Sequence, residues 1–191
     1  NNYKITPDDL LQIKNTEPKL LIFNNPSNPT GIVYTEEELK KLTPILINNN
    51  WIILSDEIYS NLVYTGNYTS ISKYCPTNTL VGYSLSKDVS CGGYRCGWIG
   101  FPSELKLMYT IAYNYVSGIY SCICTPVQYV LLTYLRENYK LMNTYIPESR
   151  KLFLLIGEMC YIYLTINTKI RVIKPSAAWY LFLNFDNYSD Q

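Results

Sequence analysis

The sequence has no histidine among its 191 residues. This absence excludes serine–histidine–aspartate triads, cysteine–histidine pairs and every metal site with a histidine ligand from this chain. The six cysteines contain no C-x-x-C pair and no zinc-ligand spacing, so reduced and mostly buried thiols are the simplest interpretation. Because thiols without a disulfide framework are typical of intracellular proteins, we expect a cytoplasmic location.

Charge and long apolar runs are also scarce. Only 16% of the residues are charged and the net charge is +1, which provides no basic surface for nucleic acid. The most apolar region, residues 152–166, is interrupted by Glu158 and falls short of the roughly 20 apolar residues that a membrane span requires. We therefore expect neither a nucleic acid nor a membrane as a partner, and the 48% hydrophobic content predicts a globular fold.

Short apolar runs alternate with a helical pattern along the first part of the chain. Residues 19–24, 51–55 and 79–83 have the length and composition of buried strands. Between the first two, residues 35–38 (TEEE) form a capping box that opens a helix, which Pro44 is expected to kink or end. Strand–helix–strand order predicts an α/β fold with a mostly parallel sheet covered by helices on both faces.

The remaining elements are expected around this sheet. Residues 98–101 form a further strand, antiparallel to its neighbour if the loop before it doubles back. Residues 117–125 are expected to be irregular. We expect helices over residues 7–13, 102–115, 126–138 and 147–163, and short strands over residues 169–174 and 179–185. The return to strand patterning indicates a second, smaller subdomain that begins near Thr144.

Polar residues follow each of the three predicted parallel strands. Asn28 comes after the first strand, Asp56 after the second and Lys87 after the third. In open α/β sheets, ligands collect at the carboxyl ends of the strands. We therefore interpret these residues as parts of one site.

A lysine among hydroxyl residues stands close to an arginine. Residues 84–87 read SLSK, and Arg95 follows eight residues after Lys87. A lysine amine can bond an aldehyde, and the planar fork of arginine suits a phosphate. This pairing indicates a lysine that holds pyridoxal 5′-phosphate as a Schiff base.

Two upstream motifs extend this interpretation. Together with residues 25–31 (NPSNPTG) and Asp56-x-x-Tyr59, the lysine motif resembles the pyridoxal-phosphate enzymes of fold type I, and most of all the class I/II aminotransferases, the aspartate aminotransferase family. The resemblance runs in order over nearly the whole chain. It implies a cofactor-binding large domain over residues 1–143, without its N-terminal part, and the truncated beginning of a small C-terminal subdomain over residues 144–191. It also implies a homodimer with a shared active site.

The resemblance assigns the reacting end of the cofactor to three residues besides the lysine. Lys87 would hold the aldehyde and later move a proton between the substrate and the cofactor. Asp56 would pair with the protonated pyridine nitrogen and keep the ring an electron sink. Tyr59 and Asn28 would donate hydrogen bonds to the 3′ oxygen. Taken alone, three of the four have an ordinary alternative: a solvated lysine, a helix N-cap for Asp56 and a turn residue for Asn28. Tyr59 alone carries no weight among 20 tyrosines.

By the same resemblance, the phosphate would lie on Ser84, Ser86 and Arg95. A hydroxyl donor adds direction to the charge of the guanidinium. Ser84 matches the family pattern better than Ser86. The ordinary alternative for Arg95 is a surface ion pair that contributes little to stability.

The implied activity is a step in amino acid metabolism. An aminotransferase would move an amino group from an amino acid to a 2-oxo acid through Lys87. The alternatives are a pyridoxal-phosphate-dependent lyase or cyclopropane-forming synthase of the same fold, or a catalytically incomplete chain. The sequence leaves the amino acid and the 2-oxo acid open.

Overall fold

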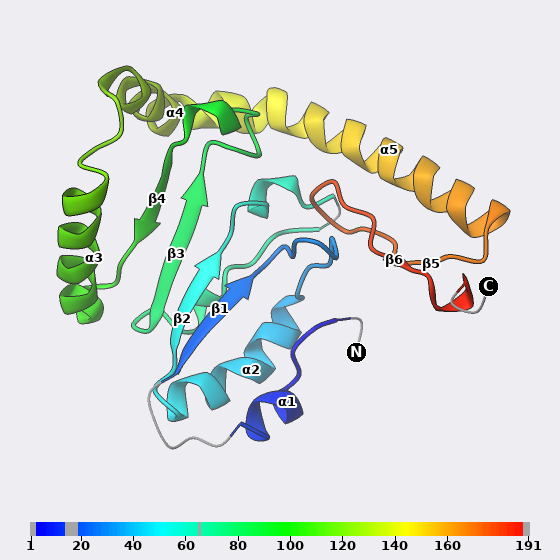
Figure 1. Ribbon diagram of the computed structural model, residues 1–191, viewed down its shortest axis with the longest axis horizontal. Helices are drawn as coiled ribbons and strands as arrows, with labels where there is room; N and C mark the ends of the chain where they lie inside the picture. Colours follow the sequence, from blue (N-terminus) through cyan, green and yellow to red (C-terminus); the bar gives the residue numbers. More distant parts are fainter. Residues whose placement is uncertain (1–2, 14–18, 65, 189–191) are drawn as a thin grey trace.

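Four strands form the central sheet of the computed structural model, which describes residues 3–13, 19–64 and 66–188 (Figure 1). They are β1 (Leu20–Asn24), β2 (Ile52–Asp56), β3 (Thr79–Ser84) and β4 (Gly97–Gly100), in that spatial order. β1, β2 and β3 are parallel, and β4 is antiparallel to β3. The predicted α/β class, the mostly parallel sheet and the antiparallel fourth strand are confirmed.

Two capped helices cover one face of the sheet. α1 (Pro7–Leu11) and α2 (Glu36–Asn48) each begin at a threonine whose side chain forms a capping box. α2 continues past Pro44, so of the two expected outcomes, a kink or an end, the end is wrong. Leu42 and Leu46, which flank Pro44, are each 1% exposed. Packing of these side chains outweighs the helical hydrogen bond that Pro44 cannot make.

The two faces of the sheet differ in burial. On the face toward α2, Phe23 and Ile53 are 2% and 0% exposed and belong to the main hydrophobic core. On the other face, Ile22 is 67% exposed and Ile99 is 51% exposed. α3 (Lys106–Ile119) lies over this second face and leaves a pocket beneath it, so helices flank both faces, as expected, but only the first is closely packed.

Three longer helices follow β4. They are α3 (Lys106–Ile119), α4 (Thr125–Asn143) and α5 (Tyr145–Asn167). In Figure 1, α3 stands beside β4, whereas α4 and α5 cross beyond the arrowheads of the parallel strands. α3 extends to Ile119, so the irregular connection is shorter than the predicted 117–125. No helix in the described part of the chain is long and apolar enough to cross a membrane.

A small two-stranded sheet completes the fold. β5 (Arg171–Val172) pairs with β6 (Leu183–Asn184) in an antiparallel ladder. α5 contacts both β5 and η1 (Ser60–Leu62), the short 3₁₀ turn that follows β2. The division of the chain near Thr144 stays a prediction; this residue lies between α4 and α5.

Candidate active site

Asn24, at the end of β1, joins the first loop to the end of β2. Its Nδ2 donates to the Asp56 main-chain oxygen at 3.3 Å, and its Oδ1 accepts from the Asn28 main-chain nitrogen at 2.5 Å. The strand register also pairs Asn24 with Asp56. Asn28 and Asp56 are thus brought to the same edge of the sheet, with the Asn28 side chain exposed to solvent.

Asp56 and Glu57 are neighbouring carboxylates with different surroundings. Asp56 is half-buried, and its Oδ1 accepts only a long hydrogen bond, 3.4 Å, from the Ile58 main-chain nitrogen. Glu57 is 6% exposed, and its Oε1 accepts from Ser55 Oγ at 2.9 Å and from Ser70 Oγ. Burial raises the pKa of the Glu57 carboxyl, and the serine hydrogen bonds partly oppose that rise. Of the two, only Asp56 has a carboxylate that remains accessible to a ligand.

Lys87 lies against two aromatic rings. Its Nζ is 5.6 Å from the centroid of the Tyr59 ring and 5.3 Å from that of Trp179. Tyr59 is 1% exposed, and its hydroxyl bonds to that of Tyr180. Burial first, and then the Tyr180 hydroxyl, raise the pKa of Tyr59, so this phenol keeps its proton at neutral pH. The structure therefore joins two predicted site residues, Lys87 and Tyr59.

Gly31 explains how Trp179 and Tyr180 reach this place. Its carbonyl oxygen accepts from the main-chain nitrogens of Ser176 and Ala177 at 2.9 and 3.1 Å. A Cβ built on Gly31 would lie 3.2 Å from the Tyr180 carbonyl oxygen, and its φ of +68° suits glycine. The loop after β1 thus docks the C-terminal segment onto the site.

Trp179 and Tyr180 were not predicted as site residues from the sequence. In a chain with 20 tyrosines, one more tyrosine carries no signal. Their position depends on a contact between segments almost 150 residues apart, and the Trp-Tyr pair after an Ala-Ala turn is the only local feature that marks them.

The three predicted phosphate residues are only partly assembled. Ser84 Oγ accepts from the Ser86 main-chain nitrogen at 3.1 Å. Arg95 is exposed, has a φ of 52°, and donates from a guanidinium nitrogen to the Gly92 carbonyl oxygen at 2.8 Å. A Cβ on Gly92 would lie 3.5 Å from the Ser86 carbonyl oxygen, so this turn packs on the serine loop. No hydrogen bond in the described structure joins the Arg95 side chain to Ser84 or Ser86.

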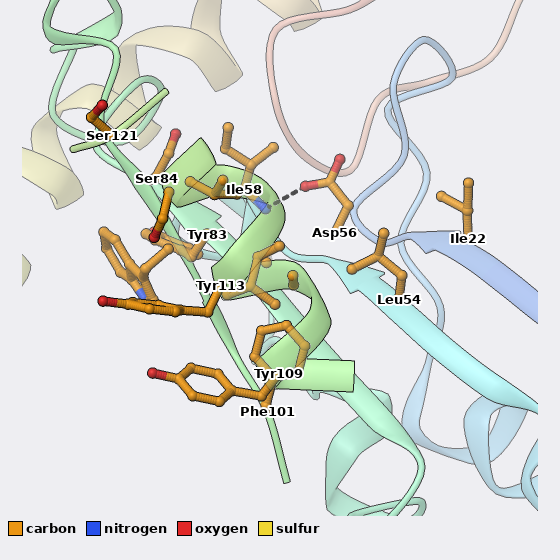
Figure 2. A pocket seen from close by; sticks show the side chains of 17 residues that line it. Ile22, Leu54, Asp56, Ile58, Tyr83, Ser84, Phe101, Tyr109, Tyr113 and Ser121 are labelled. Carbon is orange, nitrogen blue, oxygen red and sulfur yellow. Dashed lines mark hydrogen bonds between the residues drawn. The ribbon is translucent and has the colours of Figure 1, made fainter. Parts of the chain in front are cut away.

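A pocket of about 660 Å³ lies between α3 and the partly covered face of the sheet. Figure 2 shows Asp56 and Ser84 among its lining residues, with Tyr109 and Tyr113 of α3 in front of the strands. Its polar groups are thus one carboxylate and several serine and tyrosine hydroxyls, beside aromatic and aliphatic walls. Among the described residues, no group of three or more cysteine and acidic side chains is placed to hold a metal ion.

Comparison with known families places the chain. The sequence profile described as "Aminotransferase class I and II" matches residues 1–191. The chain belongs to this family. Aspartate aminotransferase of Bacillus sp. (strain YM-2) is 35% identical over 185 residues, which cover 94% of this chain and 45% of the relative. That of Geobacillus stearothermophilus is 33% identical over 189 residues, covering 96% of this chain and 46% of the relative.

Solved aminotransferase structures share the fold. Aspartate aminotransferase of Thermus thermophilus with maleate superimposes with a TM-score of 0.84 at 26% identity, covering 95% of this chain and 46% of that one. A double mutant of the same enzyme gives a TM-score of 0.87 at 24% identity, covering 99% and 48%. This aminotransferase-family chain thus spans about half the length of the relatives it matches. The family uses pyridoxal phosphate, which agrees with the cofactor that the lysine motif predicts.

Proposed function

We propose that the protein moves an amino group from an amino acid to a 2-oxo acid with pyridoxal phosphate held at Lys87. The observation that carries this proposal is the position of the Lys87 amine. It lies against the Tyr59 and Trp179 rings, just after β3, at the sheet edge where Asp56 ends β2. Membership of the family supports the reaction type.

The donor groups at this edge fit the cofactor. A lysine amine suits the aldehyde, the Asp56 carboxylate suits a protonated pyridine nitrogen, and the Tyr59 phenol suits the 3′ oxygen. Two serine hydroxyls and the guanidinium of Arg95 suit a phosphate. When bound, pyridoxal phosphate supplies an aldehyde that condenses with amines and a ring that accepts electrons from the substrate carbon.

Each side chain then has a defined task. The Lys87 amine would hold the aldehyde carbon and, once released, carry a proton to and from the substrate. The Tyr59 phenol, whose pKa is raised chiefly by burial, would remain a hydrogen-bond donor. Asn28 would be a second donor to the same oxygen, since its side chain is exposed at this edge. Ser84, Ser86 and the accessible Arg95 guanidinium would hold the phosphate.

The homodimer, the cytoplasmic location and the substrate belong to this proposal as well. Family members that match this chain are described as aspartate, asparagine–oxo-acid and glutamate–pyruvate aminotransferases. We therefore place aspartate, asparagine, glutamate and alanine first among the amino acids to be tested.

An amino-transfer assay tests the proposed function. Purified protein with pyridoxal phosphate should convert one of these amino acids only when a 2-oxo acid is present. Lys87→Ala should abolish the transfer, whereas Lys174→Ala, which removes an exposed partner of Glu158, should not change it. Ammonia release without a 2-oxo acid would indicate a lyase, and cofactor binding without turnover would indicate an incomplete site. Transfer that persists in Lys87→Ala would contradict the proposal.

A further inference from the structure

Asp88 is a buried carboxylate directly after Lys87. It is 1% exposed and lies in the loop that connects β3 to the turn before β4. A buried carboxylate is costly unless donors surround it, so its partners indicate what it does. The proposed function of Lys87 does not involve Asp88.

Three donors converge on one oxygen of Asp88. Its Oδ2 accepts from Tyr83 at 2.7 Å, from Asn61 Nδ2 at 2.8 Å and from Tyr134 at 2.9 Å. Burial first, and then the Asp88 carboxylate, raise the pKa of Tyr83 and Tyr134, so both hydroxyls keep the proton that they donate. Oδ1 is buried and has no hydrogen-bond partner among the described residues, so Oδ2 carries the whole attachment.

These donors come from segments that carry other site residues. Tyr83 precedes Ser84 at the end of β3, and Asn61 lies in η1, two residues after Tyr59. Tyr134 comes from α4, which lies beyond the strand ends. One carboxylate oxygen therefore ties the Lys87 loop to the segments that carry Ser84 and Tyr59.

The main chain of this loop is held more weakly at its tip than at its base. Cys91 N donates to the Leu85 carbonyl oxygen at 3.0 Å and closes the base. The bond from Ser90 N to the Lys87 carbonyl oxygen is 3.4 Å, which is long for this type. Ser90 Oγ bonds to the exposed Tyr145 hydroxyl at 2.9 Å, whereas Asp88 accepts three hydrogen bonds and is itself buried. Among the described side chains of this loop, Asp88 therefore makes the most hydrogen bonds.

We propose that Asp88 is a positioning residue for Lys87, because its bonds to Tyr83, Asn61 and Tyr134 hold the Lys87 amine against the Tyr59 and Trp179 rings. Of the ion pairs between described residues, none joins Lys87 to Asp88, so Asp88 acts through the loop and not through direct neutralisation. The consequence for catalysis rests on the proposed function. The position of the amine does not, and it can be measured without cofactor or substrate.

The test is the acetylation rate of Lys87 in cofactor-free protein, mapped by peptide mass spectrometry between pH 7 and pH 10, with the exposed Lys174 as the internal reference. Asp88→Asn keeps the shape and weakens the acceptor, and Asp88→Ala removes it. Release of the amine from the rings should raise its rate relative to Lys174 by about two- to fivefold in Asp88→Ala, the size of a cation–π contact. Asp88→Asn should give a smaller rise in the same direction.

Glu57→Gln is the matched control. Glu57 is another buried carboxylate, but it bonds to Ser55 and Ser70 on the other side of the sheet from Asp56. This variant removes a buried carboxylate remote from the Lys87 loop and should leave the relative Lys87 rate unchanged. Wild-type acetylation of Lys87 in folded Asp88→Asn, or an equal rise in Glu57→Gln, would overturn the proposal. If Asp88→Ala does not fold, Asp88→Asn decides alone. Loss of amino transfer in the separate assay leaves this result unaffected.

Discussion

The two faces of the sheet use their polar groups in opposite ways, as the adjacent carboxylates Asp56 and Glu57 show. Side chains alternate across a strand, so the two point to opposite faces. The face toward α2 is the closed face, and there Glu57 bonds to Ser55 and Ser70 in a buried network. The face toward α3 is the open face, and there Asp56 lines a pocket and accepts one long hydrogen bond, from the Ile58 main-chain nitrogen. The alternation of side chains therefore places one carboxylate in a buried hydrogen-bond network and leaves the other accessible to a ligand.

The largest difference is expected between two isoleucines on neighbouring strands. Ile53→Ala, at 0% exposure on the closed face, should lower the free energy of unfolding by about 2–5 kcal/mol because it leaves a cavity. Ile22→Ala, at 67% exposure on the open face, should cost less than about 1 kcal/mol, which is the range of strand propensity. Urea denaturation measures both. Equal losses would mean that the open face is covered in solution.

A smaller effect is expected where the first loop supports the C-terminal segment. Gly31→Ala should destabilise the protein by about 1–3 kcal/mol, because it strains a positive φ and crowds the Tyr180 carbonyl oxygen. Gly66 has a φ of +76°, but no described atom lies within 4 Å of a Cβ built there, so Gly66→Ala isolates the strain. Thermal denaturation should give the larger loss for Gly31→Ala. The docking of Trp179 and Tyr180 on Gly31 is contradicted if the two variants lose the same stability.

The smallest effect is expected in how the free energy of unfolding depends on pH, through Glu57 on the closed face. Burial raises the pKa of the folded Glu57 carboxyl above its ordinary value of 4.5. As pH rises from 4.5 through the folded pKa, the folded protein holds more protons than the unfolded chain, so the free energy of unfolding falls. Glu57→Gln should lack this fall.

Urea denaturation of both proteins from pH 3.5 to pH 7 measures that difference. Below pH 4 the carboxyl is largely protonated in both states, so the gap between the two proteins should there be constant. A wild-type stability that rises relative to Glu57→Gln through this range would show that Glu57 is not held in a desolvated site.

The sequence predicted most of the sheet, and it predicted two candidate site residues, Lys87 and Tyr59, that the structure places side by side. Apolar runs and a capping box predicted β1, β2, β3 and the start of α2, because these signals are local. Alternation could not show that Leu20 and Ile22 would be exposed, since an apolar run looks the same whether one face or both faces are covered. α2 continues past Pro44 because the buried leucines that flank it stabilise the helix.

Long-range contacts set the limit within the site. Lys87 and Tyr59 were found from motifs, and the structure places them together. Trp179 and Tyr180 join them through Gly31, and Asp88 is held by partners at positions 61, 83 and 134. No local sequence pattern indicates these long-range contacts. The roles of all the predicted site residues, Lys87, Asp56 and Tyr59 included, stay predictions.

Covalent capture of the cofactor tests the central claim most directly. Purified protein is incubated with pyridoxal phosphate, reduced with borohydride, digested and mapped by mass spectrometry. We predict one pyridoxyl group, on Lys87, and none in Lys87→Ala. Modification spread over exposed lysines such as Lys151 and Lys174, or no modification of Lys87, would contradict the assignment of this lysine as the cofactor's attachment point.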